Sequence, residues 1–113
     1  MKKCVRLRKS SDFKAVYRLG RSHANRLFVL YVRPQGLDYT RVGFVVGRSY
    51  GKAVARNRVK RLLREAYRAH RCKIAPGHDL IFIARSQARG KRLSDVEPAI
   101  TDLLRRGGVL LPC

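Results

Sequence analysis

The sequence predicts an α+β fold in which a small, mostly antiparallel sheet packs against helices, in the order α-β-β-α-β-α. Three observations predict it: helical spacing of apolar residues, short β-branched and aromatic runs bounded by turn residues, and a length of 113 residues that suits one domain. We expect this domain to fill residues 1–113, with a basic N-terminal arm over 1–9 and a short C-terminal tail over 107–113. The expected elements are a helix over residues 10–20, strands over 26–33 and 41–48, a helix over 55–72, a strand over 79–85 and a helix over 94–106.

The first half of the chain is predicted to hold one helix and two strands. Phe13, Val16 and Tyr17 recur at the spacing of an amphipathic helix, and Gly20 ends it. Alternation along the strand over 26–33 directs side chains to opposite faces of the sheet, with Phe28, Leu30 and Val32 on one face and Val29, Tyr31 and Arg33 on the other. The short connection to the strand over 41–48 favours an antiparallel hairpin between the two strands.

The second half is predicted to hold two helices on either side of one strand. The nearly continuous apolar run Leu80–Ala84 predicts a buried strand. Ser94, followed three residues later by Glu97, predicts a capping box at the start of the last helix. The apolar stripe of that helix ends before Gly107 and consists of Val96, Ile100, Leu103 and Leu104.

The charge of the chain indicates a polyanionic partner. There are 27 Lys and Arg residues against 7 Asp and Glu residues, a formal net charge of +20. A compact domain with this charge repels itself unless a polyanion neutralises it, and nucleic acid binding gains most because each phosphate contact releases counterions. No segment approaches the roughly 20 apolar residues of a membrane span, and Cys4, Cys72 and Cys113 have neither disulfide-framework nor zinc-ligand spacing. We therefore expect a cytoplasmic nucleic-acid-binding domain with free thiols and no membrane partner.

The helix over 55–72 separates apolar from cationic residues. At 3.6 residues per turn, its apolar stripe gathers Ala55, Val59, Leu62, Leu63 and Ala66. The opposite face holds Asn57, Lys60, Arg61, Arg64, Arg68 and Arg71, while Arg56 and Arg58 fall on the two edges of the stripe. Like charges at i, i+4 destabilise an isolated helix by roughly 0.2–0.5 kcal/mol per pair, and ordinary solvated faces mix signs. This face is therefore predicted to bind phosphates.

The segment Ala53–Arg68, with an Arg-Asn-Arg core at 56–58, resembles the signature helix of the bacterial ribonuclease P protein subunit family. Other segments agree with that family in order and spacing, namely Leu7–Ser10, Asp12-Phe13, Val16-Tyr17, Arg26–Tyr31, Arg41–Phe44 and Asp79–Arg85. The similarity covers about residues 5–106. One segment departs, because Gly47-Arg48-Ser49 stands where the family usually has Ser-Lys-Lys, which removes one cation.

The resemblance implies an α/β sandwich with a left-handed β-α-β crossover. It implies that the chain is the protein subunit of a ribonucleoprotein endonuclease that removes the 5′ leader from precursor tRNA. The implied partners are ribonuclease P RNA and precursor tRNA, with no further protein required. The residues implied to bind the catalytic RNA are Arg48, Lys52, Arg56, Asn57, Arg58, Lys60, Arg61, Arg64 and Arg68.

A cleft between the first helix and the sheet is implied to hold the single-stranded leader, with Phe13, Tyr17, Val29, Tyr31, Asn57, Lys60 and Arg64 as candidate contacts. The residues agree with this role, since Phe13 and Tyr17 share a helix face and Val29 and Tyr31 share a strand face. Stacking of bases on aromatic rings tolerates any sequence and contributes about 1–3 kcal/mol per base. The alternative is that Phe13 and Tyr17 are core residues, because amphipathic stripes usually pack inward.

The acidic residues do not suggest that the polypeptide cleaves RNA. Hydrolysis by paired metal ions needs several carboxylates close together, whereas the seven acids are scattered over the chain at Asp12, Asp38, Glu65, Asp79, Asp95, Glu97 and Asp102. The histidines His23, His70 and His78 are also dispersed. We therefore expect no catalytic residue, metal ligand or cofactor on the protein, and the resemblance implies that the RNA subunit holds the catalytic Mg²⁺.

Three other functions share some of these features. A structural RNA-binding protein of the ribosomal kind has the same charge and size, and only the motifs distinguish it. A DNA-binding regulator would insert the helix over 55–72 in a major groove, but it lacks a helix-turn-helix partner since 41–48 is predicted as a strand. A membrane-active amphipathic helix is disfavoured because the apolar stripe is rich in Ala and the chain has no Trp.

Overall fold

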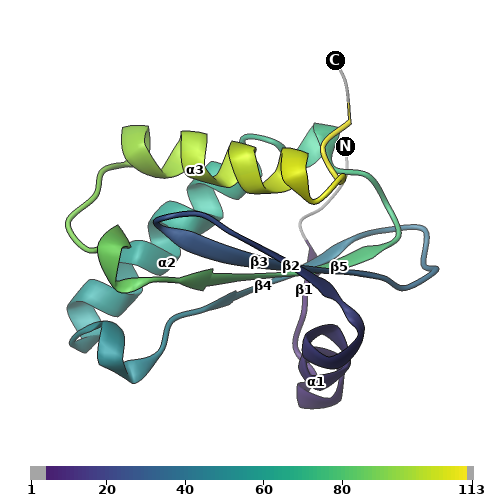
Figure 1. Cartoon of the computed structure of the whole chain (residues 1–113), viewed down its shortest axis with the longest axis horizontal. Helices are drawn as coiled ribbons and strands as arrows, with labels where there is room; N and C mark the ends of the chain where they lie inside the picture. Colours follow the sequence, from purple (N-terminus) through teal and green to yellow (C-terminus); the bar gives the residue numbers. More distant parts are fainter. Residues whose placement is uncertain (1–4, 112–113) are drawn as a thin grey trace.

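The computed structural model describes residues 5–111 and contains a five-stranded sheet with helices on both faces (Figure 1). The strands are β1 (Val5–Arg6), β2 (Arg21–Ala24), β3 (Phe28–Pro34), β4 (Arg41–Val45) and β5 (His78–Ala84). The helices are α1 (Ser10–Leu19), α2 (Ala53–Arg68) and α3 (Leu93–Arg106), joined by the short 3-10 turns η1 (Arg48–Tyr50), η2 (Arg71–Lys73) and η3 (Ser86–Ala88). The predicted α+β class is confirmed, and all six predicted elements occur in the predicted order.

The strands lie in the order β1-β4-β5-β3-β2, so β5 separates β3 from β4. β5 pairs antiparallel with β3 and parallel with β4, while β1 pairs parallel with β4 and β2 antiparallel with β3. The sheet is thus mixed and more parallel than expected, and the predicted hairpin between β3 and β4 is wrong. The physical reason is that Leu80, Ile81 and Phe82 are all 0% exposed, so β5 needs a strand on each side and cover on each face.

The connection from β4 through α2 to β5 joins two neighbouring parallel strands, which makes a β-α-β unit. The left hand of this crossover stays a prediction from the resemblance. α2 and α3 pack against each other and cover the same face of the sheet. Their buried side chains meet a layer of strand residues that includes Phe28, Leu30, Phe44, Leu80 and Phe82. This is the main hydrophobic core of the domain.

The other face of the sheet carries α1, which Figure 1 shows below the strands. Val16 of α1 is buried there with Leu7 and Ile81. The predicted alternation along β3 is confirmed, because Phe28, Leu30 and Val32 are buried toward α2 and α3 while Val29, Tyr31 and Arg33 are half-buried on the α1 side. α1 therefore covers this face only in part.

Two short strands were not predicted. β1 lies within the segment 1–9 predicted as a basic arm, and its neighbour Leu7 is buried and donates its backbone N–H to Val42 O at 2.9 Å. The described part of that segment is therefore tied to the sheet, and residues 1–4 lie outside the described residues. β2, with sequence Arg-Ser-His-Ala, has no β-branched or aromatic residue and is an edge strand held by its backbone pairing with β3.

The helix ends differ in detail from the prediction. α2 begins and ends earlier than 55–72, and Arg71 lies beyond it in η2. α3 begins at Leu93, and the Asp95 carboxylate accepts a hydrogen bond from the backbone N–H of Arg92 at 3.0 Å, so the predicted Ser94–Glu97 capping box is wrong. The backbone N–H of Arg92 at the helix start therefore finds its acceptor in Asp95, three residues later in the sequence. The predicted ends at Gly20 and Gly107 are confirmed.

The described part of the predicted tail also packs on the domain. Val109 is 0% exposed, and its carbonyl accepts a hydrogen bond from Ala75 N at 2.8 Å. Leu110 forms an isolated antiparallel bridge with Ile74. Cys72 is exposed and has no disulfide partner, whereas Cys4 and Cys113 lie outside the described residues.

Candidate nucleic-acid interface

α2 presents its predicted cationic face to solvent. Val59, Leu63 and Ala66 are buried beneath it in the main core. The side chains turned outward are exposed except for Lys60, which is half-buried, and we call this set the α2 ridge: Asn57, Lys60, Arg61, Arg64 and Arg68. The predicted separation of an apolar stripe from a cationic face is therefore confirmed.

The α2 ridge has no carboxylate partner among the residues that the structure describes. No cation of α2 takes part in an ion pair within residues 5–111. A shallow hollow of about 300 Å³ is lined by the three arginines Arg61, Arg64 and Arg68 and by the exposed Glu65. Guanidinium groups arranged in this way keep their planar donors available for an external anion such as phosphate.

Arg56 and Arg58 sit at the edges of the apolar stripe, as predicted, and both contact backbone carbonyls. Arg56 Nη2 donates to Val46 O at 3.4 Å, and its Nε is buried without a hydrogen-bond partner. Arg58 Nη1 donates to Lys91 O at 3.0 Å, which joins α2 to the loop before α3. These two arginines therefore orient the helix in addition to contributing positive charge.

Arg48 and Lys52 extend the cationic surface toward the start of α2, and both side chains are exposed. The turn between them is anchored by Tyr50, which is only 5% exposed. Arg89 Nε donates to Tyr50 O at 3.0 Å, and the guanidinium lies 5.8 Å from the centre of the Tyr50 ring. Burial raises the pKa of the Tyr50 hydroxyl. The departing segment Gly47-Arg48-Ser49 thus still presents one cation beside α2.

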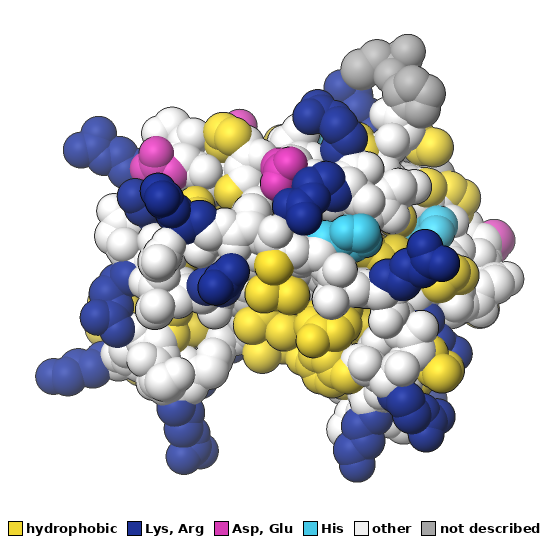
Figure 2. All heavy atoms as spheres, in the orientation of Figure 1, with side chains coloured by type: hydrophobic (Ala, Val, Ile, Leu, Met, Phe, Trp, Pro, Cys, Tyr) yellow, Lys and Arg dark blue, Asp and Glu magenta, His cyan; other side chains and the backbone are white. Residues whose placement is uncertain are grey.

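α1 and the sheet bear a second surface with a different chemistry, made of Phe13, Tyr17, Val29 and Tyr31, which we call the α1 cleft after the leader cleft predicted there. The ring of Phe13 lies directly on Gly43, where an added Cβ atom would come 2.7 Å from Phe13 Cζ. Tyr17 is 40% exposed and meets Tyr31 edge-on, with ring centroids 5.0 Å apart. Burial, and then the neighbouring Tyr31, raise the pKa of Tyr17. Figure 2 shows hydrophobic side chains gathered at the centre of the view, beside the position of α1.

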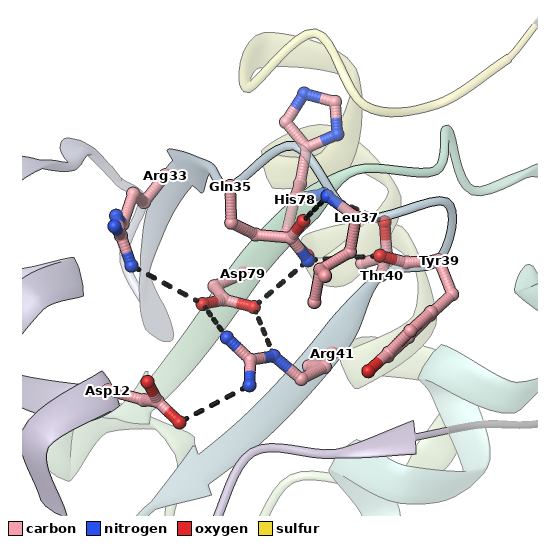
Figure 3. A network of polar contacts seen from close by, with 9 residues as sticks. All are labelled: Asp12, Arg33, Gln35, Leu37, Tyr39, Thr40, Arg41, His78 and Asp79. Carbon is pink, nitrogen blue, oxygen red and sulfur yellow. Dashed lines mark hydrogen bonds and ion pairs between the residues drawn. The ribbon is translucent and has the colours of Figure 1, made fainter. Parts of the chain in front are cut away.

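A buried ion-pair network ties α1 to the sheet beside this cleft (Figure 3). Asp79 is 0% exposed and accepts two hydrogen bonds from Arg41, from Nε at 2.8 Å and from Nη2 at 2.7 Å. The remaining Nη1 of Arg41 reaches Asp12 of α1 at 3.2 Å. Gln35 Nε2 donates to Asp79 Oδ1 at 3.3 Å, and Arg33 lies 3.8 Å from Oδ2. The hydrogen bond to Asp79 raises the pKa of Arg41, which stays charged.

The structure brings the predicted site residues together in two groups. Phe13, Tyr17, Val29 and Tyr31 share the α1 face of the sheet. Asn57, Lys60 and Arg64, predicted as leader contacts as well, lie on α2, which covers the opposite face. A single cleft that contains all seven residues stays a prediction.

Sequence reasoning missed several residues of the α1 face. Val45 and Ile83 are half-buried there and extend the apolar surface. Side chains two positions apart on a strand share a face, so Ile83 shares the face of Ile81 and Val45 that of Gly43, and this periodicity could have placed them. The Arg41–Asp79 pair had no local signal, because the two residues are 38 positions apart in the sequence.

Most of the acidic residues act as structural partners of arginine or backbone groups. Asp12 and Asp79 bind Arg41, Asp95 caps α3, and Asp102 lies 3.3 Å from Arg106 Nη1. Within residues 5–111, no group of three or more His, Cys, Asp or Glu side chains is placed to hold a metal ion. In the same range, no helix has the length and apolar character needed to cross a membrane.

Comparison with known proteins shows which family the chain belongs to. The family model for ribonuclease P matches residues 1–108. The chain belongs to the ribonuclease P protein family. The ribonuclease P protein component of Clostridium acetobutylicum is 44% identical over 108 residues, which cover 94% of this chain and 91% of that protein.

Solved ribonuclease P proteins share the fold. The structure of a Staphylococcus aureus ribonuclease P protein mutant with defective mRNA degradation activity superposes with a TM-score of 0.87 at 34% identity, covering 93% of this chain and 89% of that one. The ribonuclease P protein from Thermotoga maritima gives a TM-score of 0.82 at 36% identity and covers 89% of this chain and 96% of that one. The predicted family is therefore confirmed.

Family membership establishes the general function. The chain is a ribonuclease P protein component, which makes it a subunit of an endoribonuclease in tRNA processing, with ribonuclease P RNA as its partner. Which residues contact RNA, whether precursor tRNA binds the protein, and how protein and RNA share the reaction are addressed in the proposal below.

Proposed function

We propose that this protein docks on ribonuclease P RNA through the α2 ridge and holds the single-stranded 5′ leader of precursor tRNA in the α1 cleft. In this proposal the RNA performs the cleavage with its own Mg²⁺, and the protein strengthens and broadens substrate binding. The protein works in the cytoplasm and needs no other protein. The observation that carries the proposal is the α2 ridge, a solvent-facing row of cations without carboxylate partners in residues 5–111.

The α2 ridge supports contact with a folded RNA because its cations form no ion pairs within the described part of the protein. Arg61 and Arg68 are exposed, and neither side chain makes a hydrogen bond within the described residues. Like charges along one helix face weaken the isolated helix. Phosphate contacts reverse this cost and release counterions, which favours assembly at moderate salt. Arg48, Lys52, Arg56, Asn57 and Arg58 belong to the same proposed contact surface.

The α1 cleft supports contact with an unpaired strand because it combines aromatic rings with adjoining aliphatic side chains. Tyr17 keeps 40% of its surface exposed although it lies on the amphipathic helix, so it is not a fully packed core residue. Rings on such a platform stack on any base, which suits leaders of differing sequence. Asn57, Lys60 and Arg64 remain candidate leader contacts from α2 in this proposal.

The proposal assigns cleavage to the RNA because four of the protein's seven acidic side chains have other partners. Asp12 and Asp79 neutralise Arg41, and Asp95 and Asp102 contact Arg92 N and Arg106. A carboxylate engaged in this way is not available to hold the pair of metal ions that RNA hydrolysis requires.

The test is a cleavage assay with separated components. Purified protein, stripped of nucleic acid, is incubated with precursor tRNA at low Mg²⁺, with and without ribonuclease P RNA. We expect leader removal only when protein and RNA are both present. Because mRNA degradation activity is attributed to the Staphylococcus aureus relative, the reaction with protein alone is the decisive control. Leader removal by the protein alone, or no effect of the protein on the RNA-catalysed rate, would refute the proposal.

A further inference from the structure

A hollow of about 470 Å³ lies away from the α2 ridge, at the free edge of the sheet. β2 is the edge strand there, and its residues Arg21 and His23 line the hollow together with His78 at the start of β5 and Arg106 at the end of α3. Leu19 and Pro34 supply apolar walls. We call these six residues the β2-edge pocket.

The pocket lies on the α3 side of the sheet, opposite the α1 cleft. Arg21 and His23 stand opposite Val32 and Leu30 in the β2–β3 pairing, and these two β3 side chains are buried on the α3 side. Figure 3 shows the imidazole of His78 turned away from Asp79 and toward the pale yellow ribbon of the C-terminal part of the chain. Figure 2 shows two histidine side chains on one face of the molecule, with hydrophobic surface between them and Lys or Arg side chains beside them.

Several side-chain nitrogens around this pocket have no hydrogen-bond partner among the described residues. Arg106 uses Nη1 alone, which donates to Ala24 O at 2.9 Å and lies 3.3 Å from Asp102 Oδ2, so its Nε and Nη2 have no partner in residues 5–111. Arg21 is exposed and has no side-chain partner in the same range. His78 Nδ1 is buried and has no hydrogen-bond partner, which is unfavourable for an imidazole nitrogen.

No carboxylate lines the pocket, so its charge and its donors suit an anion. The contacts to Ala24 O and Asp102 hold the Arg106 guanidinium in place before any ligand arrives. Leu19 is 60% exposed and Pro34 is exposed, which leaves apolar surface next to the cations. A nucleotide offers both parts, a phosphate for the arginines and a base or ribose for the apolar walls.

We propose that the β2-edge pocket binds a phosphate group of RNA, as a third contact beyond the α2 ridge and the α1 cleft. The phosphate belongs either to the catalytic RNA or to precursor tRNA, and the chemistry of the contact is the same in both cases. The inference rests on the proposed function in one respect, namely that RNA is the polyanion. Arg21 and Arg106 supply the charge, and His23 and His78 supply further donors.

The test compares Arg21→Gln and Arg106→Gln with Arg105→Gln, an exposed neighbour in the last turn of α3 that does not line the pocket. Affinity is measured across a salt series in two arms, for the catalytic RNA alone and for precursor tRNA bound by the assembled holoenzyme. We expect the pocket variants to lower affinity about fivefold and to reduce the salt slope by about one unit in one arm. The arm that responds identifies the source of the phosphate. Pocket variants that match Arg105→Gln in both arms would overturn the proposal.

A measurement on the unaltered protein covers the case in which a variant fails to fold. The imidazole NMR signals of the three histidines are followed while inorganic phosphate is added at constant pH. His70 is the internal control, because it contacts Thr101 Oγ1 at 2.8 Å and does not line the pocket. We expect the signals of His23 and His78 to shift at lower phosphate concentration than that of His70. Three equal responses, or none, would contradict the proposal while leaving the α2 ridge assignment untouched.

Discussion

On the α1 side of the sheet, Arg33 of β3 and Arg41 of β4 pair with carboxylates. The arginines of the α2 ridge, by contrast, face solvent without carboxylate partners in residues 5–111. Arg41 binds Asp79 with two hydrogen bonds and reaches Asp12 with a third, and Asp79 is fully buried. Arg61 and Arg68 are exposed and form no ion pair with any described residue. The first arrangement holds α1 in place, and the second leaves charge available for another molecule.

This difference teaches how the same residue type serves two purposes in one small domain. Removal of one partner from the largely buried Arg41–Asp79 pair leaves the other charge without its partner in the interior, which destabilises the fold. An exposed arginine in a row of like charges adds little to stability and gains its value from a polyanion. The two regions should therefore respond to substitution in opposite ways.

The largest expected effect is on stability, from Asp79→Asn. The substitution leaves Arg41 with only Asp12 as an ionic partner, and removal of one partner from a buried pair destabilises a protein by roughly 3–5 kcal/mol. Because the Arg41 side chain is 20% exposed, we expect a loss near the lower end, about 3 kcal/mol. Urea denaturation measures the free energy of unfolding. Asp38→Asn, at an exposed acid, is the control, and equal stability of the two variants would remove the contrast between the regions.

The next effect is on RNA affinity, from the double variant Arg61→Gln/Arg68→Gln. Each lost phosphate contact should lower affinity for ribonuclease P RNA about tenfold and reduce the salt slope by about one unit. The free energy of unfolding should stay the same or rise slightly, because like charges are removed. Filter binding across a salt series gives the slope. Arg8→Gln/Arg105→Gln removes the same charge elsewhere, and a slope that falls equally in both double variants would speak against a localised ridge.

A smaller effect is expected in the α1 cleft, from Tyr17→Ala. Loss of one stacking ring should weaken holoenzyme affinity for precursor tRNA about tenfold, since a stacked base contributes about 1–3 kcal/mol. Mature tRNA lacks the leader, so its affinity should not change. Tyr39 is 41% exposed, nearly the same as Tyr17 at 40%, which makes Tyr39→Ala a matched control. Equal losses for precursor and mature tRNA would show that the cleft does not hold the leader.

The smallest effect concerns pH, through His70. Burial, and then Lys73, lower the pKa of His70 below its ordinary value of 6.5, while Glu97 acts in the opposite direction. The unfolded chain therefore takes up a proton at this site before the folded protein does, so stability falls as pH drops below about 6.5. We expect the free energy of unfolding to fall less in His70→Gln than in the unaltered protein between neutral pH and pH about 5.5. An equal fall in the free energy of unfolding of both proteins would contradict a lowered pKa of His70 in the folded state.

The sequence predicted local features well because periodicity reports them directly. The faces of β3, the stripe of α2 and the edge positions of Arg56 and Arg58 follow from residue spacing, and the structure confirms them. Strand pairing was predicted less well, since a short loop favours a hairpin while β5, buried on both faces, takes the central position between β3 and β4.

Contacts between distant positions carried no local signal. The Arg41–Asp79 pair depends on β4 and β5 being neighbours, and the pairing was not known from the sequence. The β2-edge pocket depends on β2, whose Arg-Ser-His-Ala sequence lacks the usual residues of a strand. The family resemblance predicted which surfaces carry function, but the separation of the α2 ridge from the α1 cleft by the sheet required the structure.

The most direct test of this account is the ratio of holoenzyme affinities for precursor and mature tRNA, measured with protein at concentrations that saturate the catalytic RNA. At saturation, the double variant Arg61→Gln/Arg68→Gln should keep the ratio of the unaltered protein, because its defect lies in docking. Tyr17→Ala should lower the ratio about tenfold. A ratio that falls equally in both variants would contradict the division of function between the α2 ridge and the α1 cleft.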